Sequence, residues 1–158
     1  MTYEIANTVW YYQDGELYWK ISTAQQKPGK IAGYKHETGI YKQVKYKGKY
    51  YYCHRIIYLL HHKYLPKYID HINRIKTDNR IENLRQCTAS QNMANNNGWA
   101  NKELPKGISR NGSGYIARIM HNGKQMRLGT FRTIEDAEAK YNEIARILQQ
   151  EYAYVACA

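Results

Sequence analysis

The chain is poor in cysteine, and the placement of its cysteines excludes two common ways of stabilising a small domain. Cys53, Cys87 and Cys157 are odd in number and far apart, with no Cys-x-x-Cys pair among them. Structural zinc sites and redox motifs depend on closely spaced cysteines. We therefore expect three reduced thiols and a fold that apolar packing holds together.

Long hydrophobic runs are also missing. No stretch of about 18 apolar residues could span a bilayer, and the N-terminus lacks the basic, apolar and small-residue segments of a secretion signal. These absences predict a protein without a membrane partner that stays in the compartment where it is made, the cytoplasm.

Acidic residues are few in comparison with basic ones. Lysine and arginine number 24 against 13 aspartates and glutamates, a net charge of +11, and the excess is spread along the whole chain. Seventeen tyrosines and three tryptophans lie among the lysines. Simple solubility could explain the charge, but this composition favours a nucleic-acid partner. A sheet that presents aromatic rings could also stack the bases of RNA, which remains an alternative.

The segment YIDHINRIKTDNRIENLRQCTASQNMANNN, residues 68–97, predicts a strand, a polar loop, a second strand and a helix capped by Thr88 or Ser90. If the helix packs across the hairpin, Asp70, His71 and Asn92 converge. Carboxylate and amide oxygens suit a hard divalent cation. A neutral imidazole beside them could take a proton from water.

At these residues the chain resembles the HNH endonucleases of the phage homing type, which have the ββα-metal fold. The resemblance implies that Asp70 and Asn92 hold one divalent ion, magnesium or manganese, that His71 is the general base, and that Asn83 braces the loop. It also implies a double-stranded DNA substrate and, for a bacteriophage protein, a place in the cytoplasm of the host cell. Here the signature reads His-Asn-Asn.

His54 opens the apolar run HRIIYLLHH directly before this motif. Packing or bracing is the favoured interpretation, with a direct role in DNA or metal binding as the alternative. The other histidines are expected to be ordinary surface or core residues.

The first third of the chain predicts small antiparallel sheets. Asp14-Gly15 and Lys47-Gly48 are hairpin turns between aromatic or alternating runs. Such a β module could contact DNA through a lysine-rich face, or could only stabilise the nuclease. Residues 54–64 then predict a buried helix that ends before Pro66.

The last third predicts three short strands, with a turn at Asn122-Gly123, followed by a helix from about Ile134. The apolar residues of this helix recur at a spacing of three and four, so one stripe would cover the apolar face of the sheet. Arg118 and Arg127 would then lie on the other face.

Through the Gly-Ile opening at Gly107, the YIARI strand and RLGTF, this part resembles the Apetala-type, or ethylene-response-factor, DNA-binding domain. The resemblance implies that a three-stranded sheet reads the major groove. The plant domains have arginines where this chain has Ser109 and Asn111, and tryptophan where it has Arg127. The residues that we expect to contact DNA are Arg85, Lys106, Ser109, Asn111, Arg118, Gln125 and Arg127.

Together these patterns predict an α+β protein that is a metal-dependent homing-type DNA endonuclease, a monomer or weak homodimer that nicks or cuts at a preferred site. A DNA-binding regulator with an inactive nuclease core is the main rival. The expected divisions are a β module at 1–52, the nuclease core at 53–97, a linker at 98–105 and the DNA-binding domain at 106–152.

Overall fold

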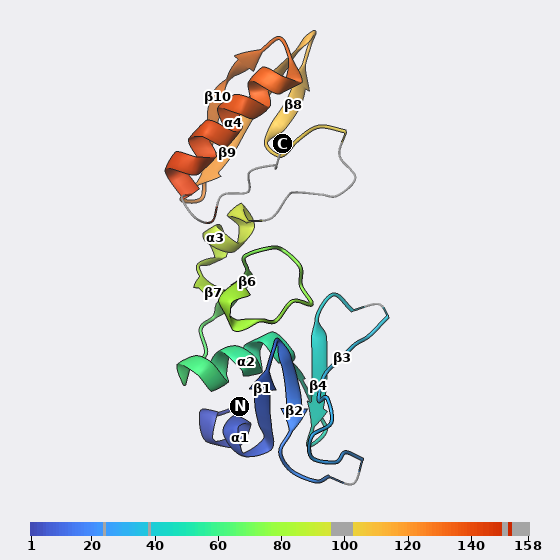
Figure 1. Ribbon diagram of the computed structural model, residues 1–158. Helices are drawn as coiled ribbons and strands as arrows, with labels where there is room; N and C mark the ends of the chain where they lie inside the picture. Colours follow the sequence, from blue (N-terminus) through green and yellow to red (C-terminus); the bar gives the residue numbers. More distant parts are fainter. Residues whose placement is uncertain (24, 38, 96–102, 150–151, 153–158) are drawn as a thin grey trace. The chain divides into compact units, whose positions relative to one another are not determined.

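The computed structural model describes residues 1–23, 25–37, 39–95, 103–149 and 152. It is an α+β fold, as predicted, and it divides into two compact units, Met1–Gln86 and Cys87–Ala158 (Figure 1). Of the expected linker at 98–105, residues 98–102 lie outside the described part of the chain, as does Cys157. The described residues contain no helix that is long and apolar enough to cross a membrane.

The described residues of the first unit form three small sheets, two helices and a short 3-10 helix. β1 pairs with β2, β4 lies between β3 and β5, and β6 pairs with β7. The elements are α1 (Tyr3–Val9), β1 (Trp10–Gln13), β2 (Glu16–Trp19), β3 (Tyr34–Lys35), β4 (Lys42–Tyr46), β5 (Lys49–Tyr52), α2 (Cys53–His62), β6 (Tyr68–His71), η1 (Ile81–Asn83) and β7 (Leu84–Cys87).

The two turns predicted in this unit are confirmed, and their backbone angles explain the residues used. Asp14 and Gly15 have φ of 48° and 85°, and Lys47 and Gly48 have φ of 46° and 77°. Two successive positive φ values are typical of a type I′ turn, whose twist matches that of the strands it joins. These turns fix the register of β1 with β2 and of β4 with β5.

One hydrophobic core lies under both the N-terminal sheets and α2. It contains Trp10, Trp19 and Val44 from the sheets and Ile56 and Ile57 from α2, all nearly inaccessible to water. The two tryptophan rings are 5.6 Å apart. Residues 1–52 therefore share their core with α2. A separate β module at residues 1–52 that contacts DNA remains a prediction.

The N-terminal segment contains a helix that the sequence did not predict. The 1–52 segment was expected to hold strands alone, but α1 runs from Tyr3 to Val9, with the Thr2 side chain accepting a hydrogen bond from the Ile5 amide. Ala6 and Val9 pack into the common core. Seven residues are too few for a clear periodic pattern, and tertiary packing stabilises such a short helix.

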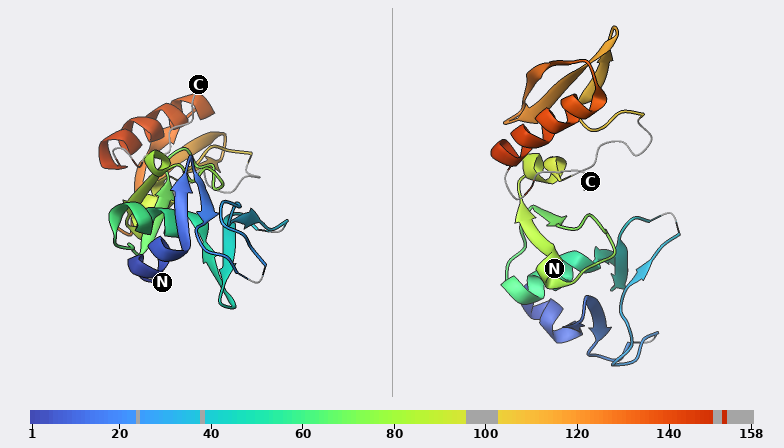
Figure 2. Two further views of the ribbon diagram at one scale, coloured as in Figure 1. Left: turned by 60° about the horizontal axis from the view of Figure 1, so that its bottom comes forward. Right: turned by 45° about the horizontal axis from the view of Figure 1, so that its top comes forward.

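The second unit begins with α3 (Ala89–Ala94), which has Thr88 as its N-cap, and continues with β8 (Ile108–Asn111), β9 (Gly114–His121), β10 (Lys124–Phe131) and α4 (Ile134–Gln149). β9 lies between β8 and β10. The predicted Asn122-Gly123 turn and the long C-terminal helix are both confirmed. Figure 2 shows α4 lying along one face of the sheet.

The register of the three strands defines two faces. On one face Ala137 of α4 packs with Ile108 and Ala117, and Tyr141 packs with Ile119. Arg118 pairs with Arg127 across β9 and β10, and side chains of neighbouring residues on a strand point to opposite faces. The two arginines therefore lie on the face that α4 does not cover.

Gly107 is expected to be indispensable to the second unit. It has φ of 78°, and a Cβ there would lie 2.3 Å from Tyr141 Cε2 and 2.4 Å from the Arg118 carbonyl oxygen. Backbone strain and overpacking together predict that Gly107→Ala lowers the free energy of unfolding by about 2–4 kcal/mol. Urea denaturation measures this loss.

Gly112→Ala is the matched control. Gly112 also has a positive φ, 59°, but a Cβ there meets no described atom within 4 Å. It should cost about 1 kcal/mol from backbone strain alone. Equal losses in the two variants would contradict the packing argument.

Candidate active site

The predicted catalytic pair lies at the end of β6, in the interior of the first unit. Asp70 and His71 are each only 1% exposed. β6 pairs with β7, and the Ile72 amide donates to the Asn83 carbonyl at 2.9 Å, which joins the two ends of the polar loop. The predicted order of strand, loop, strand and helix is confirmed in the chain, with η1 added before β7.

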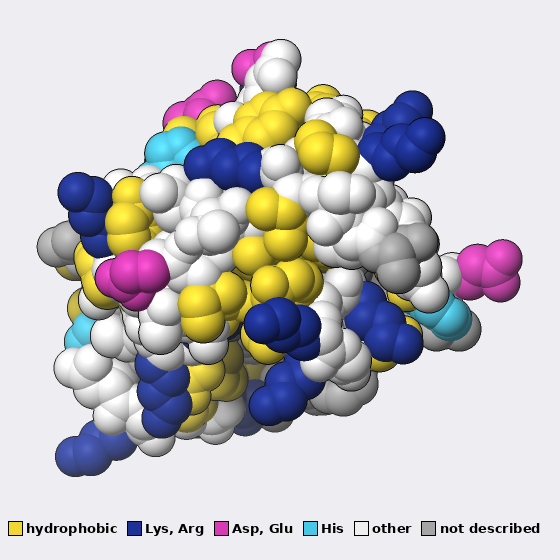
Figure 3. Space-filling model, turned by 90° about the horizontal axis from the view of Figure 1, so that it is seen from below, with side chains coloured by type: hydrophobic (Ala, Val, Ile, Leu, Met, Phe, Trp, Pro, Cys, Tyr) yellow, Lys and Arg dark blue, Asp and Glu magenta, His cyan; other side chains and the backbone are white. Residues whose placement is uncertain are grey.

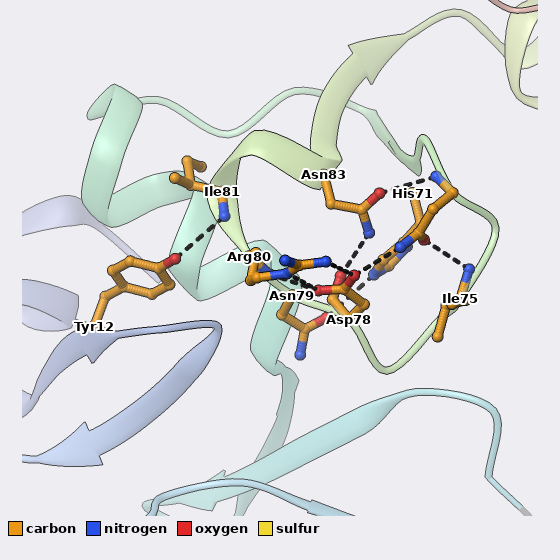
Figure 4. Close-up of polar contacts among 9 residues, drawn as sticks. Tyr12, His71, Ile75, Asp78, Asn79, Arg80, Ile81 and Asn83 are labelled. Atoms are coloured by element: carbon orange, nitrogen blue, oxygen red, sulfur yellow. Dashed lines mark hydrogen bonds and ion pairs between the residues drawn. The ribbon is translucent and has the colours of Figure 1, made fainter.

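Asn83 connects two points of this loop through its side chain. Its Oδ1 accepts a hydrogen bond from the Asn73 amide at 2.9 Å, and its Nδ2 donates to the Asp78 carbonyl at 2.7 Å (Figure 4). Both bonds hold backbone groups that would otherwise need water. The geometry is that of a loop brace, the role that the resemblance implies.

Asp78 adds a second set of contacts to the same loop. Its carboxylate accepts from Arg80 Nε at 2.9 Å, from Arg80 Nη2 at 2.7 Å and from Asn73 Nδ2 at 2.6 Å. Hydrogen bonds from Arg80 are the main cause that holds the pKa of Asp78 below its usual range. Burial opposes them, and the hydrogen bond from Asn73 adds to the lowering. The loop therefore has an ionised carboxylate at neutral pH as one of its fixed points.

The imidazole of His71 is held by a residue that the sequence predicted only as part of a polar loop. His71 Nε2 lies 3.1 Å from Asn79 Oδ1, and Asn79 is 2% exposed. In the tautomer with its proton on Nε2, this nitrogen donates to Asn79, and the lone pair that can accept a proton is on Nδ1. Only the fold, which closes the loop over the strand, reveals this contact.

Burial keeps His71 neutral. Loss of solvent is the main cause that lowers its pKa, and the hydrogen bond to Asn79 and the nearby Asp70 only partly oppose it. A neutral imidazole at pH 7 is the form that can act as a base.

Asp70 has a cationic partner, Arg85, that the sequence analysis predicted as a DNA contact. Arg85 Nε and Nη2 donate to Asp70 Oδ2 at 3.0 and 2.9 Å. Arg85 was predicted to contact DNA, but here its guanidinium balances a carboxylate that is buried, as a buried charge requires. The contact with DNA remains a prediction.

The donors fit a hard divalent cation in their chemistry, since carboxylate and amide oxygens are the ligands that magnesium and manganese prefer. For a cation to bind Asp70 Oδ2, the guanidinium of Arg85 would have to move away from that oxygen. Asn92, the other predicted ligand, lies on α3 in the second unit, so its convergence with Asp70 remains a prediction. Among the described residues, no group of three or more His, Cys, Asp or Glu side chains could hold a metal ion.

His54 lies beside His71. Their ring centres are 5.1 Å apart in an edge-to-face arrangement, and Tyr41 and Tyr52 lie 5.1 and 5.6 Å from His54. Burial, followed by the neighbouring His71, lowers the pKa of His54 to about 3, so it is neutral. Its Nδ1 is buried without a hydrogen-bond partner among the described residues. This placement favours the bracing interpretation.

Of the residues predicted to contact DNA in the second unit, some lie on its sheet and Lys106 contacts the end of α3. Arg118 donates to Ser109 Oγ at 2.8 Å, which fixes both on the uncovered face of the sheet. Gln125 is exposed on β10, and Asn111 is exposed at the end of β8. Lys106 instead donates to the carbonyls of Met93 and Ala94 at the end of α3, where a helix dipole favours a cation.

The comparisons with known proteins agree with this geometry. Residues 51–94 match the family model described as HNH endonuclease. The chain is 36% identical over 103 residues to an uncharacterized HNH endonuclease, L560, of Acanthamoeba polyphaga mimivirus, with 63% of this chain and 54% of that protein covered. The chain thus spans about half the length of this relative. No solved structure matches.

These similarities indicate a nuclease, and the family match includes every residue from β6 to Asn92. The family match ends at residue 94. The resemblance of residues 106–152 to the Apetala-type domain therefore remains a prediction.

Asn83→Ala should loosen the active-site loop. It removes two hydrogen bonds and leaves the Asn73 amide and the Asp78 carbonyl without this partner, so we expect a loss of about 1–3 kcal/mol in the free energy of unfolding. Urea denaturation measures it. Glu82→Ala, at the exposed neighbouring position, should change stability by less than about 0.5 kcal/mol. An Asn83→Ala variant as stable as the wild type would contradict the bracing role.

Proposed function

We propose that this protein is a metal-dependent endonuclease that hydrolyses phosphodiester bonds in double-stranded DNA. The observation that carries the proposal is the Asp70-His71 pair at the end of β6, with the imidazole fixed by Asn79 and the following loop braced by Asn83. The match of this segment to the HNH endonuclease family supports the same reading.

The chemistry follows from the charge of the substrate. A phosphodiester repels a nucleophile, so water must be deprotonated as it attacks. His71 Nδ1 accepts that proton, and the Asn79 contact keeps the ring oriented while the imidazolium forms. The P–O3′ bond breaks and the 3′ oxygen leaves. A divalent cation held by Asp70 and Asn92 would stabilise the charge that develops on the phosphoryl and leaving oxygens.

The second unit is proposed to supply affinity for DNA. The sheet face that carries Arg118, Arg127, Ser109 and Gln125 is the one that α4 does not cover, and the net charge of +11 favours a polyanion. Arginine can pair bidentately with guanine or grip phosphate. One active site per chain favours nicking of one strand by a monomer.

His71→Ala tests the proposed base. Removing a general base typically slows a reaction by about 100-fold to 10,000-fold, whereas affinity for DNA should change little. Supercoiled plasmid incubated with magnesium or manganese measures nicking, and a mobility-shift assay in EDTA measures binding. His62→Ala, outside the loop, should nick like the wild type. Undiminished nicking by His71→Ala would remove His71 from the mechanism, and no nicking by the wild type would favour an inactive DNA-binding protein.

Arg118→Ala and Arg127→Ala test the sheet face. Each should weaken DNA binding by about 1–3 kcal/mol if it reads a base, with relaxed discrimination at one position, or should weaken it uniformly if it grips phosphate. Fluorescence anisotropy at several salt concentrations separates the two. Arg146→Ala is the matched control because Arg146 is exposed on α4, the helix on the opposite face. Equal affinity in all four proteins would move the DNA contact elsewhere.

A further inference from the structure

The outer face of the β3–β4–β5 sheet in the first unit presents three exposed tyrosines. In the register of the sheet, Tyr34 pairs with Gln43 and Gln43 with Tyr52, while Lys45 pairs with Tyr50. Paired residues share a face, so these side chains form two adjoining rows. Tyr34, Tyr50 and Tyr52 are 49%, 56% and 44% exposed.

This surface, the tyrosine face, is also basic. The strands β3, β4 and β5 contain no acidic residue. Lys45 shares this face, with its Nζ 5.5 Å from the centre of the Tyr50 ring, whereas Lys49 pairs with Tyr46 on the opposite face. On the face of the molecule in Figure 3, dark blue basic side chains lie beside yellow hydrophobic ones, a class that includes tyrosine. Aromatic rings interleaved with lysine are complementary to bases that alternate with phosphates.

The tyrosine face continues into the active site through ring contacts. Tyr52 stacks on His54, with ring centres 5.6 Å apart and planes inclined by 28°, and His54 contacts His71 at 5.1 Å. Tyr41 makes a parallel connection, 5.5 Å from Tyr52 and 5.9 Å from His71. The tyrosine face is therefore two ring contacts away from the proposed base.

The spacing of the rings decides which form of DNA fits. Tyr50 and Tyr52 are two residues apart on one strand, so they are about 6.7 Å apart, roughly twice the 3.4 Å rise between stacked bases in a duplex. A base in a duplex has both faces covered by its neighbours. Only unpaired, unstacked bases could lie against these rings, as in proteins that bind single strands.

We propose that the tyrosine face binds unpaired nucleotides of the DNA next to the scissile phosphate, by stacking bases on Tyr34, Tyr50 and Tyr52 while Lys45 pairs with phosphate. This inference rests on the proposed endonuclease function and assigns it a substrate form, DNA that is locally opened beside the site of cleavage.

Binding of a labelled oligothymidylate of about 20 nucleotides to the full chain tests the proposal. Fluorescence anisotropy in EDTA separates binding from cleavage. Stacking energies predict that Tyr50→Ala weakens single-strand binding by about 5- to 100-fold, and that Tyr34→Ala does the same. Tyr50→Phe keeps the ring and should bind within about twofold of the wild type. A duplex of the same length should bind all three variants within about threefold of the wild type.

Tyr64→Ala is the matched control, since Tyr64 is 50% exposed but follows α2, outside the sheet. It should leave single-strand binding unchanged. If Tyr50→Phe loses as much affinity as Tyr50→Ala, the hydroxyl and not the ring makes the contact, and the proposal is overturned. Equal losses of affinity for the duplex and for the single strand overturn it as well. Unchanged single-strand binding by both alanine variants also overturns it.

Photocrosslinking of the wild type keeps the proposal testable if a variant fails to fold. An oligonucleotide with 5-iododeoxyuridine should crosslink to Tyr34, Tyr50 or Tyr52, as mapped by mass spectrometry, and crosslinks found only elsewhere would overturn the proposal. Failure of the endonuclease function would appear separately, as a wild type that binds the single strand but nicks no plasmid.

Discussion

The central constraint on the first unit is the burial of a carboxylate and an imidazole, side by side, at the end of β6. A buried charge is costly unless it is paired, and an imidazole must be held neutral and oriented if it is to act as a base. Arg85 balances the charge of Asp70, and Asn79 holds the imidazole of His71. Asn83 and Asp78 fix the loop that joins β6 to η1. Arg85 and Asn79 thus contact the buried pair directly, whereas Asn83 and Asp78 contact the loop that follows it.

Local chemistry made a large part of this fold predictable. Three turns with glycine at the second position, the Thr88 cap and the apolar stripe of α4 all depend on residues near one another in sequence. The pair Asp70-His71 was predictable for the same reason. The contacts of Asn79 and Arg85 were not, because they depend on how the loop closes over β6 and on the pairing of β6 with β7. The sequence left open whether residues 1–52 stabilise the nuclease or contact DNA. The core that they share with α2 could not be predicted because contacts far apart in sequence determine it.

The two units carry different surfaces for a polyanion. The sheet face of the second unit offers arginines with planar, bidentate geometry, suited to the edges and phosphates of a duplex. The tyrosine face of the first unit offers exposed aromatic rings and Lys45, two ring contacts away from His71. We propose that the sheet face of the second unit holds intact DNA and that the tyrosine face receives the part that is opened for cleavage. A single active site would then act on one strand.

Manganese binding, followed by electron paramagnetic resonance, tests most directly whether Asp70 and Asn92 hold one ion beside His71. The account predicts that Asp70→Ala and Asn92→Ala each weaken binding, and that the double variant is little worse than Asp70→Ala alone, because both remove ligands of the same ion. Glu82→Ala should bind like the wild type. Asn92→Ala with unchanged manganese affinity would contradict the account, since the cation would then lie away from the helix that follows β7.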